Sequence, residues 1–95
     1  MVQPMSWILL NIDYHDKSIA IVDDEEDIVS LFLEAIEQYG YFVLGFTNPN
    51  ILINYIHQHP DQIGLILIDY KLPQLTGCEL ANQIFRIIQK SKWYC

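Results

Sequence analysis

The sequence predicts an α/β fold, an open parallel sheet with flanking helices, from two patterns in its 95 residues. Short, nearly continuous apolar runs rich in branched residues recur along the chain, and such runs are typical of strands buried on both faces of a parallel sheet. A segment with apolar residues at helical spacing follows each run. Alternating strands and helices with short connections imply parallel strands joined by right-handed crossovers. We therefore expect three strands and three helices.

The first strand is predicted at Ser18–Val22, because this run is apolar and branched. It ends in five acidic residues, 23–27, and acidic residues favour the first turn of a helix, where the backbone dipole is positive. Gly40 is the expected helix stop. The predicted apolar face of this first helix consists of Ile28, Leu31, Phe32, Ala35, Ile36 and Tyr39.

The second strand is predicted at residues 41–46, and the helix after it begins at Asn48 and Pro49. Asparagine is a preferred N-cap residue and proline is common at the first helical position. Pro60 ends that helix, whose apolar side holds Leu52, Tyr55, Ile56 and His59.

The third strand is predicted at residues 64–68, with Asp69 at its carboxyl end. A loop carrying Pro73 follows. The third helix begins near Cys78, and Leu80, Ala81, Ile84, Ile87 and Ile88 form its apolar stripe.

Composition restricts the classes of function. Apolar residues make up 52% of the chain, which excludes a disordered tail. Twelve acidic and five basic residues give a net charge of −7, so we expect no binding to nucleic acid or to an anionic membrane surface. The apolar run 7–10 is too short to span a membrane and lacks the flanks of a secretory signal. A cytoplasmic protein is the simplest interpretation.

Residues 1–16 differ from the regular pattern that begins at residue 17. They contain Pro4, the short apolar run and a polar stretch from Asn11 to Asp16. They fit a flexible leader, an extra strand, or a start codon placed too early, and the sequence does not choose among these. We therefore treat 1–16 as a leader of unknown structure and 17–95 as the domain.

Three carboxylates stand at strand ends: Asp23 and Asp24 after the first strand, and Asp69 after the third. Each has an ordinary interpretation, because Asp often caps a helix or forms a turn. In open parallel sheets, however, ligands bind beyond the carboxyl ends of the strands. If the first and third strands are neighbours, the three carboxylates share one pocket. Such a pocket suits Mg²⁺, and a carboxylate is a competent nucleophile toward phosphorus.

Two segments, 19–25 and 65–73, together with Gly77, resemble the receiver domain of two-component response regulators, which has a flavodoxin-like fold. The acidic pair, the later aspartate, and the proline and glycine four and eight residues after it are in the family's positions. The resemblance implies that Asp23 and Asp24 bind Mg²⁺ together with Asp69. It also implies that Asp69 accepts a phosphoryl group and that the backbone carbonyl of Lys71 is a further metal ligand. Pro73 and Gly77 would shape the loop.

The sequence departs from the family because receivers have five strands and five helices, and only three of each are predicted here. A hydroxyl residue after the fourth strand and a lysine after the fifth contact the phosphoryl group in the family. Thr76, the expected cap of the third helix, and Lys71 do not replace them. We therefore expect a partial receiver domain, and an exposed apolar edge on the third strand that promotes self-association.

Two functions remain open. The first is a phosphoacceptor module, not an enzyme, that receives a phosphoryl group on Asp69 from a sensor histidine kinase or phosphotransfer protein. The second is a truncated, non-switching remnant that acts as a protein-interaction module or has no function.

Overall fold

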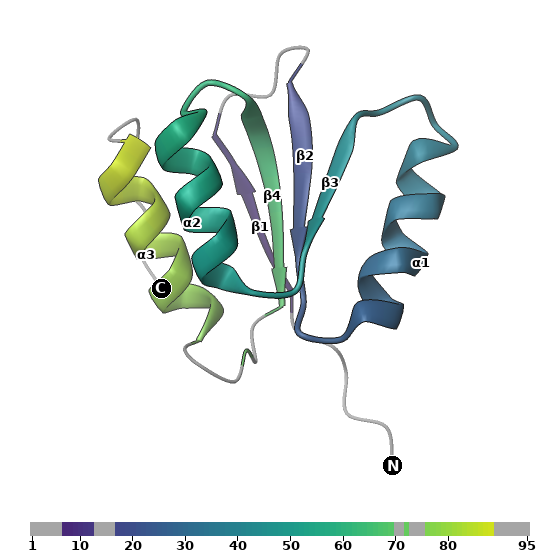
Figure 1. The fold of residues 1–95 in the computed structure, drawn as a ribbon, viewed down its shortest axis with the longest axis horizontal. Helices are drawn as coiled ribbons and strands as arrows, with labels where there is room; N and C mark the ends of the chain where they lie inside the picture. Colours follow the sequence, from purple (N-terminus) through teal and green to yellow (C-terminus); the bar gives the residue numbers. More distant parts are fainter. Residues whose placement is uncertain (1–6, 13–16, 70–71, 73–75, 89–95) are drawn as a thin grey trace.

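A computed structural model describes residues 7–12, 17–69, 72 and 76–88. Helices α2 and α3 lie on one side of a sheet and α1 lies on the other (Figure 1), as expected for an α/β fold of alternating strands and helices. In chain order the elements are β1 Trp7–Asn11, β2 Ser18–Val22, α1 Glu26–Glu37, β3 Val43–Phe46, α2 Pro49–Gln58, β4 Ile63–Asp69 and α3 Gly77–Ile88. No described helix is long and apolar enough to cross a membrane.

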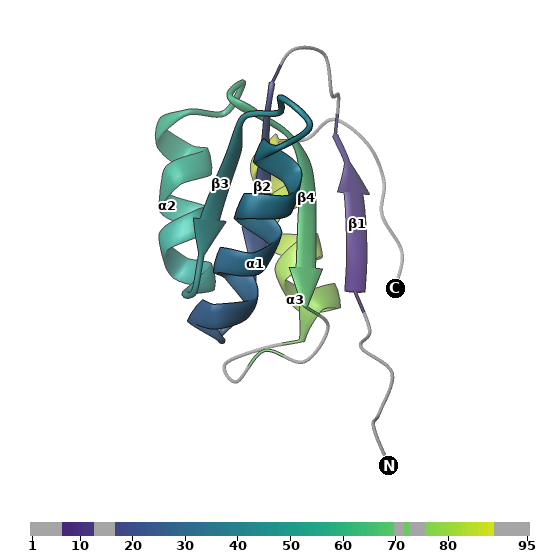
Figure 2. The ribbon, with the colours of Figure 1, turned by 90° about the vertical axis from the view of Figure 1, so that its right-hand side faces the viewer.

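The sheet has the strand order β1-β4-β2-β3. Strand β2 pairs in parallel with both β3 and β4, as the three-strand prediction requires. Strand β1 is additional and runs antiparallel to β4, with Trp7 opposite Asp69 and Asn11 opposite Leu65 (Figure 2). Of the three interpretations left open for residues 1–16, the structure therefore has an extra strand at Trp7–Asn11.

The expectation of an exposed edge on the third predicted strand is wrong. That strand is β4, and all five residues of β1 pair with it, so its backbone groups are satisfied on both sides. The uncharged strand β1 now forms one edge of the sheet and β3 forms the other. On this side of the sheet, the strand that could pair with another chain is therefore β1 and not β4.

Strand alternation explains why β1 fits this position. Successive side chains point to opposite faces of a sheet. Leu10 is almost fully buried and joins the main core, whereas Leu9 is 59% exposed on the other face. The main core lies between the sheet and the helices α2 and α3; its fully buried members include Ala20, Val22, Leu52, Ile56, Ile66, Ile68, Leu80, Ala81 and Ile84.

The predicted buried face of α1 is partly wrong. Leu31 and Tyr39 were expected on it but are 63% and 81% exposed. Val29 is buried instead, and Leu33 packs beside it at Gly45 of β3. A Cβ atom on Gly45 would collide with Val29 and lie 3.2 Å from a methyl group of Leu33, so the glycine lets α1 approach the sheet.

The helix ends follow the predicted signals. Gly40 has a positive φ of 86°, as a glycine after a helix often does. The Asn48 side chain accepts a hydrogen bond of 2.9 Å from the backbone N–H of Asn50. At α3, the Glu79 N–H donates to the Thr76 hydroxyl (3.2 Å) and the Thr76 N–H donates to the Glu79 carboxylate (3.0 Å). This reciprocal pair is a capping box, which confirms Thr76 as a helix cap.

Candidate carboxylate site

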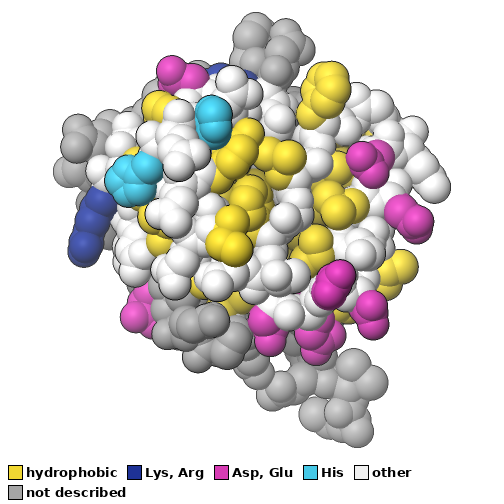
Figure 3. All heavy atoms as spheres, viewed as in Figure 1, with side chains coloured by type: hydrophobic (Ala, Val, Ile, Leu, Met, Phe, Trp, Pro, Cys, Tyr) yellow, Lys and Arg dark blue, Asp and Glu magenta, His cyan; other side chains and the backbone are white. Residues whose placement is uncertain are grey.

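The sheet brings the three predicted carboxylates to one edge. Strands β2 and β4 are parallel neighbours, with Val22 opposite Ile68, so the residues that follow these two also lie side by side. Asp23 directly follows β2, and Asp69 is the last residue of β4. Several acidic side chains gather at the lower end of the molecule in Figure 3, where the arrowheads of β2 and β4 lie in Figure 1.

One carboxylate oxygen from each of Asp23, Asp24 and Asp69 lies within 4.8 Å of the other two. The three groups differ in their contact with solvent: Asp23 is 2% exposed, Asp69 is half-buried and Asp24 is exposed. The cluster is therefore anchored in the protein at Asp23 and open to solvent at Asp24.

Backbone groups hold Asp23 in place. Its N–H donates to the carbonyl oxygen of Phe46 (3.1 Å), which extends the pairing of β2 with β3 by one residue. Its Oδ1 accepts a hydrogen bond of 2.9 Å from the N–H of Glu25, the residue before α1. Asp23 thus also performs the ordinary turn-forming role of an aspartate before a helix.

The environment of Asp23 opposes its ionisation. The pKa of this carboxyl rises from 3.8 to about 6, chiefly because the group is buried, and the hydrogen bond from the Glu25 N–H opposes the rise. The negative charge of Asp69 contributes to this rise, as do a side-chain hydrogen bond with Asp24 and the charge of Asp24. A cation among the three groups would oppose the repulsion between them.

The oxygen set fits a small hard cation. Mg²⁺ binds oxygen at 2.0–2.1 Å, so oxygens on opposite sides of the ion lie roughly 4 Å apart. The three oxygens lie within 4.8 Å of one another, so one ion could bind all three once the carboxylates turn toward it. They leave further coordination positions for water or a phosphoryl oxygen.

Two predicted residues, Lys71 and Pro73, lie outside the described residues. Leu72 between them is 8% exposed and belongs to the main core. Gly77 is buried and is the first residue of α3.

Trp7 is a neighbour of the site that the sequence did not indicate. It pairs directly with Asp69 across β1 and β4. The only sequence signal for a strand here was the short apolar run at 7–10, and such a run does not indicate which strand it pairs with.

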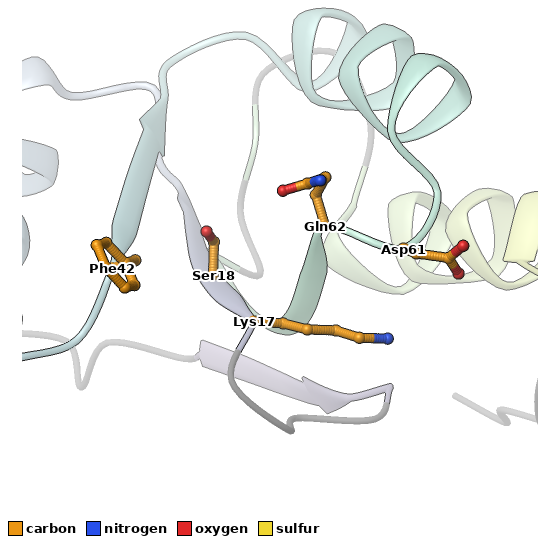
Figure 4. Close-up of a pocket in the computed structure, with 5 residues that line it drawn as sticks. All are labelled: Lys17, Ser18, Phe42, Asp61 and Gln62. Carbon is orange, nitrogen blue, oxygen red and sulfur yellow. The ribbon is translucent and has the colours of Figure 1, made fainter.

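A depression lies at the opposite end of the sheet from the carboxylates (Figure 4). It is lined by Lys17, Ser18, Phe42, Asp61 and Gln62, and the Ser18 N–H donates to the Gln62 carbonyl oxygen (2.9 Å). Because Ser18 begins β2 and Gln62 precedes β4, this depression is at the amino ends of the parallel strands, away from the three carboxylates. Ligand sites in open α/β sheets lie at the other end.

Comparison with known proteins matches the model of the response regulator receiver domain to residues 19–92. The response regulator GtcR of Aneurinibacillus migulanus is 34% identical over 68 residues, which are 72% of this chain and 27% of the relative. The alkaline phosphatase synthesis transcriptional regulatory protein PhoP of Bacillus subtilis is 36% identical over 70 residues, 73% of this chain and 28% of the relative. The polar-differentiation response regulator DivK of Brucella anthropi is 36% identical over 67 residues, 70% of this chain and 52% of the relative.

The chain thus spans about a quarter of the length of the first two relatives and about half of the third. No solved structure matches. The family match covers β2 to α3 and includes all three carboxylates at the carboxyl ends of β2 and β4. The chain belongs to the response regulator receiver domain family.

Proposed function

We propose that this receiver domain accepts a phosphoryl group on Asp69 while Asp23, Asp24 and Asp69 hold Mg²⁺. The observation that carries the proposal is the meeting of three carboxylate oxygens within 4.8 Å at the carboxyl ends of β2 and β4. By the family resemblance, the backbone carbonyl of Lys71 is a further ligand. The phosphoryl donor is a sensor histidine kinase or a phosphotransfer protein, and the domain itself is an acceptor rather than an enzyme.

In the transfer, a carboxylate oxygen of Asp69 attacks the phosphorus atom of the donor. A new O–P bond forms, and the bond between phosphorus and the donor atom breaks, with its electron pair leaving on the donor. Bound Mg²⁺ supplies positive charge that offsets the charge on the phosphoryl oxygens. Asp23 stays in place because its backbone continues the sheet and its Oδ1 is held by the Glu25 N–H.

Phosphoryl uptake can be tested without the natural donor. The protein is incubated with acetyl phosphate and Mg²⁺, and its intact mass is recorded over time. The test variant is Asp69→Asn, and the matched control is Asp61→Asn, an exposed aspartate at the opposite end of the sheet. We expect one added phosphoryl group in the unchanged protein and in the control, and none in Asp69→Asn.

The second candidate, a non-switching remnant or interaction module, predicts no mass gain in any of these proteins. Uptake in Asp69→Asn would also contradict the assignment, because it would place the phosphoryl group on another residue. We expect the reaction to take place in the cytoplasm, where phosphoryl donors derived from ATP are available.

A further inference from the structure

Strand β1 places an aromatic side chain beside the phosphoacceptor. In an antiparallel pair, directly opposed residues have their Cβ atoms about 5 Å apart and their side chains on the same face. Trp7 and Asp69 are such a pair, and they are the last pair before β4 leaves the sheet. The pairing with β1 therefore holds the backbone of β4 as far as Asp69, the residue proposed to carry the phosphoryl group.

The same side chain contacts α1. The rings of Trp7 and Phe32 meet edge to face, with centroids 5.1 Å apart and an interplanar angle of 67°. Aromatic pairs of this kind stabilise a contact by roughly 0.5–1.5 kcal/mol beyond the area that they bury. Helix α1 begins just after Asp23 and Asp24. Trp7 thus pairs with Asp69 at the end of β4 and contacts α1, the helix that follows Asp23 and Asp24.

The faces of the strands agree with this arrangement. An apolar groove is lined by Ile36 of α1 and by strand residues, so these strand residues point to the α1 side of the sheet; they are Leu9, Ile19, Leu65 and Leu67. Asp69 lies two residues after Leu67, and Trp7 lies two residues before Leu9, so alternation puts both on the α1 side. Figure 2 shows β1 running beside β4 with α1 in front of the sheet.

We propose that Trp7 is a positioning residue for phosphoryl acceptance: by packing between Asp69 and Phe32, it fixes the Asp69 carboxylate relative to Asp23 and Asp24. The inference rests on the proposed function of Asp69. Reactions at a positioned group are sensitive to its placement, and a displacement of about 1 Å can lower the rate roughly a hundredfold.

The test compares three variants with the unchanged chain, with acetyl phosphate as donor and intact mass as readout. Trp7→Ala removes the ring, and Trp7→Phe keeps an aromatic ring against Phe32. Leu9→Ala is the control for weakening β1, because Leu9 lies on the same strand and face but opposes Leu67. The initial phosphorylation rate is measured over a series of Mg²⁺ concentrations, after circular dichroism has shown that each variant is folded.

We expect Trp7→Ala to lower the rate roughly tenfold to a hundredfold, to raise the half-saturating Mg²⁺ concentration, or both. Trp7→Phe should restore most of the rate, and Leu9→Ala should remain close to the unchanged chain. An unchanged rate in Trp7→Ala overturns the inference alone, as does an equal loss in Leu9→Ala. Failure of the unchanged chain to gain a phosphoryl group overturns the proposed function and this inference together.

A spectroscopic measurement covers the case in which Trp7→Ala does not fold. The chain has two tryptophans, so Trp93→Phe leaves Trp7 as the single indole. Addition of Mg²⁺ should change its fluorescence, and the change should be lost in the Asp69→Asn variant on the same background. Fluorescence that does not respond to Mg²⁺ at concentrations that saturate phosphorylation would show that Trp7 does not sense the site.

Discussion

Replacing Asp23 by asparagine should stabilise the metal-free protein at neutral pH. Asparagine has the same shape, and its Oδ1 keeps the hydrogen bond from the Glu25 N–H. What it removes is a negative charge that is 2% exposed and stands beside two other carboxylates. The residue proposed to help bind the metal is therefore also one that weakens the fold when no metal is present.

The magnitude follows from the pKa of Asp23. Its value rises from 3.8 to about 6 on folding, a difference of about 2.2, and each pKa unit corresponds to 1.36 kcal/mol. Between these two values the folded state binds more protons than the unfolded state. The contribution of Asp23 to stability is therefore greatest below pH 3.8 and is lost as pH rises through about 6. Above that pH the ionised Asp23 destabilises the fold by about 3 kcal/mol, a large share of the roughly 5–15 kcal/mol of a typical domain.

Urea unfolding in the presence of a chelator measures this effect. Asp23→Asn should raise the free energy of unfolding by about 2–3 kcal/mol near pH 7.5 and by only about 0.5 kcal/mol near pH 4. The control is Asp27→Asn, an exposed aspartate in the first turn of α1, where loss of the charge should change stability by less than about 1 kcal/mol.

Added Mg²⁺ should favour the unchanged protein over the Asp23→Asn variant. It should stabilise the unchanged protein, because a ligand that binds only the folded state adds to its stability, and it should stabilise Asp23→Asn much less. A gain in Asp23→Asn that is equal at both pH values would refute the reasoning, because it would not depend on ionisation. A loss of stability at pH 7.5 would show that the Asp23 carboxylate contributes favourably to the metal-free fold.

Three further predictions concern the fold. Gly45→Ala should lower the free energy of unfolding by about 1–3 kcal/mol, because its Cβ atom would press α1 away from β3; denaturant unfolding with no loss would show that Val29 and Leu33 move aside freely. Thr76→Ala should cost about 1 kcal/mol in the same measurement, because the N–H of Glu79 loses its acceptor, and an unchanged midpoint would contradict the cap. Leu9→Lys should reduce self-association at high concentration in light scattering, because this side chain is 59% exposed on an edge strand; equal scattering by both proteins would point to another surface.

The parallel part of the fold could be predicted because its signals are local. Apolar runs, the Asn48 cap, and Gly40 after α1 each depend on a few neighbouring residues. The meeting of Asp23 and Asp69 followed from one additional condition, that the first and third predicted strands are neighbours, and the structure meets it. The bonding partners of Asp23 and the rise in its pKa could not be predicted, because they depend on burial by the assembled sheet.

The errors have physical causes. Helix α1 carries apolar residues around much of its circumference, so periodicity offered more than one face, and the space above Gly45 selects the face with Val29 and Leu33. Strand β1 was left open because five residues show little periodicity and their partners lie far along the chain, at the end of β4. The pairing of Trp7 with Asp69 is a long-range contact of this kind, and no short window of sequence contains it.

The pairing of β1 with β4 decides where a strand from another molecule can join the sheet. Had β4 been an edge, a strand from another molecule could have paired next to Asp69. Because β1 already occupies that position, added strands meet the sheet at the outer side of β1 or of β3. Neither strand carries any of the three carboxylates. We therefore expect self-association through these edges to be compatible with the proposed phosphoryl acceptance, so mass measurements on associated protein should still show uptake on Asp69.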